Sequence, residues 1–220
     1  MKLICISDTH GKHEQTGLQF GDPHGDVVVC AGDISSVGGE EEVREFCEWF
    51  ADLPIEHKVL VAGNHDFYFA RFHIIAMGMC DALGITYLED SGATIDGVKF
   101  WGSPWTPWFN DWAFNAQRGK EIKQHWDLIP DDTDVLVTHG PPYGCLDRPN
   151  APWLPSHGAS LGCEELAKAV LRVKPKLHVF GHIHSGRESP SIESETIFVN
   201  ASICTERYQA TNNPTEVKID

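Results

Sequence analysis

The sequence predicts an α/β fold in which two β-sheets are flanked by helices. Short runs of β-branched and other apolar residues recur along the chain, and after five of them polar residues follow within three positions. Patterns with helical spacing lie between these runs, and such an alternation of strands and helices is typical of layered α/β proteins. Further short strand-like segments favour a two-sheet sandwich over one doubly wound sheet.

Five apolar runs are predicted to be strands that are buried on both faces, because each run is continuous and does not alternate with polar residues. In chain order they are residues 3–6, 27–30, 59–61, 135–137 and 178–180. Four shorter segments are expected to add antiparallel pairing, at residues 93–95, 98–101, 191–192 and 197–200. His178 lies within the last long run and is interpreted as a core histidine.

Two helices are indicated by apolar residues spaced three and four apart. The apolar stripe of the first lies behind a glutamate-rich face and consists of Val43, Phe46, Cys47 and Phe50. The stripe of the second consists of Leu166, Val170 and Val173. The second pattern stops before a proline, which cannot continue a helix.

Length, composition and charge exclude several classes of protein. With 220 residues, of which 41% are hydrophobic and 22% charged, we expect a single globular domain over residues 1–220. The formal net charge of −15 disfavours a nucleic-acid polymer as partner, although a small phosphate ester bound through cations remains compatible with it. No apolar run is long enough to cross a bilayer, so no membrane partner is expected. Seven widely spaced cysteines and the lack of a signal-like segment predict a reducing, cytoplasmic setting. The oligomeric state stays open.

The polar residues after the five strands are candidate metal ligands. Because ligands gather beyond the carboxyl ends of strands in α/β sheets, we expect these residues to converge on one crevice. They are Asp8, His10, Asp33, Asn64, His139, His182 and His184. Mixed oxygen and imidazole donors suit Zn, Mn or Fe, and seven ligands suit two ions that share a carboxylate. Taken alone, either aspartate could be a turn or helix-cap residue.

These residues fall in five short motifs, which occur in a fixed order along the chain. The motifs are D-x-H at 8–10, G-D at 32–33, G-N-H-D at 63–66, H-G at 139–140 and G-H-x-H at 181–184. The ordered set resembles the calcineurin-like metallophosphoesterases, and the resemblance spans nearly the whole chain. Stretches at 102–107, 112–115, 138–142 and 200–202 resemble one subgroup, the small brain-type metallophosphoesterase-domain phosphodiesterases and their bacterial relatives.

The resemblance implies a four-layer α/β/β/α sandwich of two mixed β-sheets and two divalent transition metal ions, Mn, Fe or Zn. One ion would be held by Asp8, His10, Asp33 and His184. The other would be held by Asp33, Asn64, His139 and His182, so that Asp33 bridges the pair. A metal-bound hydroxide would attack the phosphorus, and His65 would protonate the leaving oxygen as the general acid.

The expected activity is hydrolysis of small phosphodiesters, and the subgroup resemblance points towards cyclic nucleotides. Phosphoprotein phosphatases of this superfamily carry arginines that grip the phosphate, and a carboxylate that orients the general acid, at the second and third motifs. This chain has neither the arginines nor that carboxylate at the corresponding positions. A phosphomonoesterase or protein phosphatase is the alternative within the superfamily. A non-catalytic metal-binding scaffold is the alternative from another class. Scaffolds of that kind typically lack the acid histidine or several of the ligands, and this chain has all of them.

Two features stay open at this level. Asp66 could orient His65, or it could cap a helix that starts there. The aromatic segment Trp101 to Phe114 could pack in the core, or it could roof a pocket in which a flat ring stacks.

Overall fold

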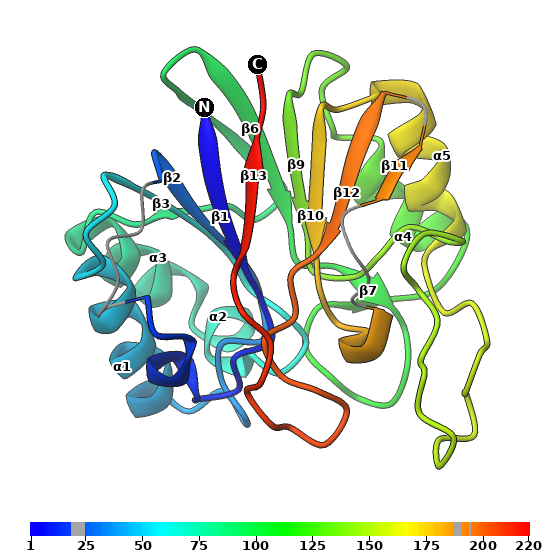
Figure 1. The fold of residues 1–220 in the computed structure, drawn as a ribbon, viewed down its shortest axis with the longest axis horizontal. Coiled ribbons are helices and arrows are strands. Elements are labelled where there is room, and N and C mark those ends of the chain that lie inside the picture. Colours follow the sequence, from blue (N-terminus) through cyan, green and yellow to red (C-terminus); the bar gives the residue numbers. More distant parts are fainter. Residues whose placement is uncertain (19–24, 187–190, 194) are drawn as a thin grey trace.

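Two β-sheets pack face to face, and helices cover the outer face of each (Figure 1). The computed structural model describes residues 1–18, 25–186, 191–193 and 195–220. The predicted α/β class and the four-layer α/β/β/α order are confirmed.

The first sheet has the strand order β13-β1-β2-β3-β4. Its strands are β1 (Lys2–Ile6), β2 (Val27–Ala31), β3 (His57–Val61), β4 (Thr86–Tyr87) and β13 (Thr215–Lys218). Strands β1 to β4 are parallel, and β13 pairs antiparallel with β1. The carboxyl ends of three predicted strands therefore lie along one edge.

The second sheet has the order β11-β12-β10-β9-β6-β5. Its strands are β5 (Ser91–Ile95), β6 (Val98–Ser103), β9 (Val135–Thr138), β10 (Leu177–Phe180), β11 (Ser191–Glu193) and β12 (Thr196–Asn200). The expectation of antiparallel pairing is only half right. Strand β6 pairs antiparallel with β5 but parallel with β9. Strand β12 pairs antiparallel with β11 but parallel with β10. Short turns allow antiparallel hairpins, whereas long crossovers bring in the parallel neighbours. A separate two-stranded ladder joins β7 (Thr106–Pro107) and β8 (Asn115–Ala116).

The helices form the two outer layers. The first sheet carries α1 (Glu40–Ala51), α2 (Phe67–Arg71) and α3 (His73–Ala82), and the second carries α4 (Lys120–Trp126) and α5 (Glu164–Val173). Two short 3-10 turns are η1 (His13–Thr16) and η2 (His184–Gly186). The predicted stripes of α1 and α5 are buried. The pattern did not predict α3, whose Ile74 and Ile75 are exposed and so do not join a buried stripe.

Alternate residues of the strands enter different layers of the core. In β1, Leu3 and Cys5 face the second sheet, while Ile4 and Ile6 face the helices. The predicted burial of these strands on both faces is therefore confirmed. Each fully buried aliphatic side chain contributes about 1.5–3 kcal/mol, so the edge that carries the polar residues rests on rigid strands.

His178 lies in β10 on the side of α5 and is completely buried. Its Nε2 is 2.8 Å from Thr138 Oγ1, and its Nδ1 has no hydrogen-bond partner. Burial lowers the pKa of His178 to about 3, so this histidine is a neutral core residue. Among the described residues, no helix is long and apolar enough to cross a membrane.

Candidate metal centre

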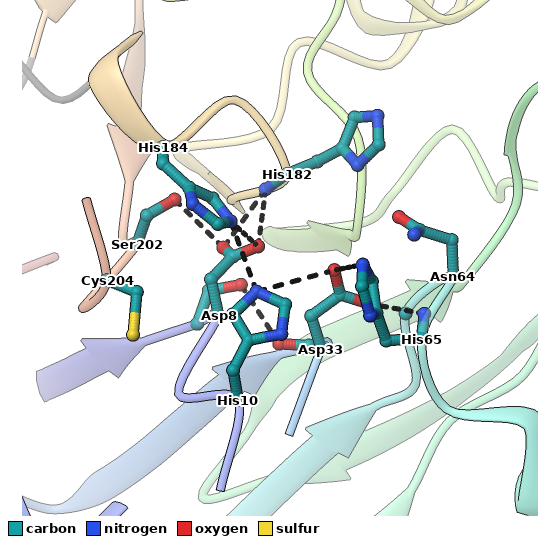
Figure 2. Close-up of polar contacts among 12 residues, drawn as sticks. Asp8, His10, Asp33, Asn64, His65, His182, His184, Ser202 and Cys204 are labelled. Carbon is teal, nitrogen blue, oxygen red and sulfur yellow. Dashed lines mark hydrogen bonds and ion pairs between the residues drawn. The ribbon is translucent and has the colours of Figure 1, made fainter. Parts of the chain in front are cut away.

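All seven predicted ligands lie at the shared edge where the carboxyl ends of both sheets meet. Figure 2 shows Asp8, His10 and His184 directed toward one another, with Asp33 beside them. The two sheets are tied together here, because His139, after β9, donates its Nδ1–H to the Ala31 carbonyl of β2 at 2.8 Å. The backbone N–H of His182, after β10, also donates to the Asp8 carboxylate.

The backbone at this edge adopts unusual conformations. Asp8, His10, Asp33 and His182 have positive φ angles of 53°, 43°, 52° and 68°. Such conformations cost roughly 1–3 kcal/mol at non-glycine residues and cluster at functional sites. At two motif positions only glycine fits, because a neighbouring carboxylate lies too close for a side chain. A Cβ on Gly63 would collide with the Asp33 carboxylate, and a Cβ on Gly181 would collide with the Asp8 carboxylate.

Asp8, His10 and His184 form a first group whose ligand atoms all lie within 4.8 Å of one another. Backbone carbonyls of Ser35 and Thr205 accept from Nδ1 of His10 and His184, at 3.2 Å and 3.0 Å. Both Nε2 atoms consequently face inward, 3.2 Å apart. Two imidazole lone pairs at this distance repel each other unless a proton or a metal cation lies between them.

Asp33, His139 and His182 form a second group of the same kind. His139 Nε2 lies 2.9 Å from Asn64 Oδ1 and 3.3 Å from Asp33 Oδ2. Three acceptor atoms of these side chains therefore converge when His139 is neutral, and a cation satisfies all three.

The ionisation of these groups fits metal binding. Burial opposes a charge on the two aspartates, yet His184 beside Asp8 and His139 beside Asp33 hold both carboxyl pKa values well below the usual range. Burial likewise opposes protonation of His139 and His184, but the facing carboxylates raise the pKa of each to about 9. A cation that binds to His139 and His184 would have to displace the protons that these raised pKa values favour.

Asp33 connects the two groups. Its Oδ2 atom lies 3.3 Å from His139 Nε2 and 3.9 Å from His10 Nε2, so a single carboxylate oxygen faces an imidazole of each group. Its Oδ1 atom accepts the backbone N–H of His65 at 2.8 Å. The carboxylate is thus fixed in orientation by the loop that carries Asn64 and His65.

His65 lies at the edge of the centre, with Nε2 4.0 Å from Asp33 Oδ2. Its Nδ1–H donates to the Ser36 carbonyl at 2.7 Å, which leaves Nε2 on the side of the cluster. The ring of Trp112 stacks on the imidazole at 4.1 Å between centroids. A backbone carbonyl therefore orients this histidine.

Asp66 plays neither of the two roles considered for it. Its carboxylate does not cap α2, and it accepts from the backbone N–H groups of Gly63, Ile34 and Ser35 and from the Ser35 hydroxyl. The side chain is completely buried. Asp66 thereby ties the loop after β2 to the loop after β3 and holds Asp33 next to Asn64.

Two residues at the centre were not predicted from the sequence, Ser202 and Tyr208. The Ser202 hydroxyl, after β12, contacts Asp8 Oδ2 at 2.8 Å. Tyr208 packs against His10 and His184, with ring centroids 4.8 Å and 5.5 Å away. Ser202 could have been found, because residues 200–202 also follow a strand-like run. Nothing local marks Tyr208.

The aromatic segment divides between the core and the site. Trp105 and Phe114 pack together edge to face, and Phe114 belongs to the core between the first sheet and its helices. Trp112 stacks on His65, and Phe109 lies against His182 at 5.2 Å. The loop between β7 and β8 therefore covers part of the candidate centre.

Comparisons with known proteins agree with this geometry. The family model described as calcineurin-like phosphoesterase matches residues 1–186. Metallophosphoesterase domain-containing protein 1 of Homo sapiens is 38% identical over 235 residues, a match that covers 97% of this chain and 69% of that protein.

Two solved structures share the fold. The phosphopantetheinyl hydrolase of Mycobacterium tuberculosis superposes with a TM-score of 0.65 at 16% identity and covers 94% of this chain and 90% of that one. A structure described as a novel archaeal phosphodiesterase gives a TM-score of 0.50 at 16% identity and covers 99% of both chains. At these identities, the likeness concerns the fold alone.

Proposed function

The chain belongs to the calcineurin-like phosphoesterase family. We propose that it hydrolyses small phosphodiesters at a pair of divalent metal ions. The family match and the human relative confirm the resemblance seen in the ordered motifs. The family is one of metal-dependent phosphoesterases, and the structure contains residue groups that could hold metal ions. The number of ions, their identity and the diester preference are the proposed parts.

The observation that carries the proposal is the position of Asp33 between two groups of ligands. Asp8, His10 and His184 would hold one ion, and Asn64, His139 and His182 the other, with Asp33 shared by both. Imidazole and carboxylate donors favour Mn, Fe or Zn over Mg or Ca. Two divalent cations against two carboxylates leave a positive site in a protein whose net charge is −15.

When bound, such a pair of ions would activate a water molecule and offset the charge of the phosphate. The side chains have separate tasks. Asp66 and the His65 backbone N–H keep Asp33 in place, and His65 would deliver a proton from Nε2 to the leaving oxygen. The aromatic loop around Trp112 would limit the access of bulk water to His65.

A diester preference follows from the second and third motifs. Ile34, Ser35 and Ser36 follow Asp33, and Ala62 precedes Gly63, so neither motif supplies an arginine for the extra negative charge of a monoester. A monoester dianion therefore gains little there beyond the ions themselves. Cyclic nucleotides, which the subgroup resemblance points towards, are the first natural diesters to test.

The proposal is tested with bis(p-nitrophenyl) phosphate and p-nitrophenyl phosphate, on protein loaded with Mn²⁺ and on the same protein treated with EDTA. We expect the loaded protein to hydrolyse the diester faster than the monoester, and EDTA to reduce both rates to background until Mn²⁺ is restored. Absence of turnover by a folded protein that binds Mn²⁺ would support a binding scaffold instead. A preference for phosphopeptides over every diester would indicate a protein phosphatase.

A further inference from the structure

A cavity of about 470 Å³ opens beside the candidate metal centre. Its lining includes Trp108 and Phe109 of the loop between β7 and β8, Leu154 and Leu161 of the segment before α5, and His182. Because His182 is also one of the predicted ligands, the cavity adjoins the place where a phosphate would bind. Its volume lies in the range of about 300–1,000 Å³ that is usual for small-molecule sites.

Much of the lining of this cavity is apolar. Phe109 is held against the His182 ring at 5.2 Å, and Trp108 keeps half of its surface exposed. Leu154 and Leu161 lie in the loop before α5, and both are only partly buried. Aromatic and aliphatic surfaces that remain accessible in a cavity bind a flat ring favourably.

The charges of the lining residues are unfavourable for a second anion. Arg118 lines the cavity, but its guanidinium pairs with Glu164 at 2.5 Å and donates to the carbonyls of Leu161 and Gly162, each at 2.8 Å. Glu206 also lines it, with Oε1 accepting from the backbone N–H and the hydroxyl of Ser185. Glu206 is therefore a carboxylate of the lining that forms no salt bridge with another described residue.

We propose that this cavity binds an uncharged aromatic ring carried by one ester group of the phosphodiester, and that it selects such substrates over alkyl diesters and over those with a second anionic group. This inference rests on the proposed function and specifies its substrate class. Walls of Phe109 and Leu154 provide the ring's contacts, and Glu206 disfavours a negative charge and accepts from N–H groups at the ring edge.

Three diesters with the same leaving group test the preference: methyl, phenyl and 4-carboxyphenyl p-nitrophenyl phosphate. In each, water adds to phosphorus and the bond to p-nitrophenolate breaks, so differences reflect the group that is retained. We expect kcat/KM for the phenyl ester to exceed that for the methyl ester by about tenfold or more, as burial of a ring allows. The 4-carboxyphenyl ester should lose most of this advantage.

Two variants and a matched control assign the preference to the cavity. Leu154→Ala should reduce the phenyl-to-methyl ratio at least about threefold, because the ring loses apolar contact. Glu206→Gln should raise the rate on the carboxyphenyl ester relative to the phenyl ester. Leu171→Ala, at an exposed position of α5 outside this cavity, should leave both ratios unchanged.

A binding measurement tests the inference without turnover. The Mn²⁺-loaded protein is titrated calorimetrically with phenylphosphonate and with methylphosphonate, whose P–C bonds are not hydrolysed. The phenyl compound should bind about tenfold more tightly, and Leu154→Ala should reduce this difference in affinity. Equal affinities would overturn the inference even if both esters are hydrolysed. Tighter phenyl binding with no hydrolysis of any ester would support the cavity's role and contradict the proposed function.

Discussion

Asp33→Asn is expected to yield a folded protein that has lost nearly all of its bound metal and activity. Asp33 is the carboxylate that faces both ligand groups, and a neutral amide offsets much less charge between two cations. Substitution of residues that merely support a ligand weakens metal affinity about 10–100-fold, so loss of a shared ligand charge should reduce activity by more than about a hundredfold.

The fold should tolerate this substitution. The amide oxygen of asparagine can still accept the His65 backbone N–H, and its NH₂ can donate to His139 Nε2. Elemental analysis, circular dichroism and diester kinetics on the same preparation measure the three effects. Asp132→Asn, at an exposed aspartate paired with Lys99, is the matched control and should keep both metals. Two metals at full occupancy in folded Asp33→Asn would disprove the shared role.

His65→Ala is expected to keep its metals while losing activity selectively. General-acid catalysis contributes about 10²–10⁴-fold, and it matters most for leaving groups that are poor. The loss should approach that range on alkyl or nucleoside esters and be much smaller on a nitrophenyl ester. The contact of His65 with Asp33 is made by the backbone N–H, so alanine preserves it.

Steady-state rates on matched alkyl and nitrophenyl diesters, together with metal content, measure this selectivity. His73→Ala removes an exposed histidine that pairs with Glu89 and should leave both rates unchanged. Equal losses on the two substrates, with metal content intact, would mean that His65 positions the phosphate and does not deliver a proton.

The strands and the clustering of the candidate ligands could be predicted from the sequence because their signals are local. A continuous apolar run buried on both faces is visible in the chain itself, and a polar residue at its end needs no knowledge of distant partners. Convergence of Asp8 with His184 then follows from the rule that sites form at the carboxyl edges of parallel strands.

Contacts between distant backbone segments could not be found in this way. The Ser36 carbonyl that orients His65, and the amides of Ile34 and Ser35 that bind Asp66, carry no residue-type signal. The parallel pairing of β6 with β9 depends on a long crossover, and the local pattern favoured its hairpin with β5. The sequence therefore predicts which side chains lie together at the candidate centre. The backbone contacts that hold them in place are seen only in the structure.

We propose that this chain assembles two metal sites around Asp33. Anomalous diffraction at the manganese edge, from crystals of the Mn²⁺-loaded protein, tests it directly. We predict two peaks that share Asp33, one coordinated by Asp8, His10 and His184 and the other by Asn64, His139 and His182. A single peak, or manganese bound away from Asp33, would show that Asp33 does not join two metal sites.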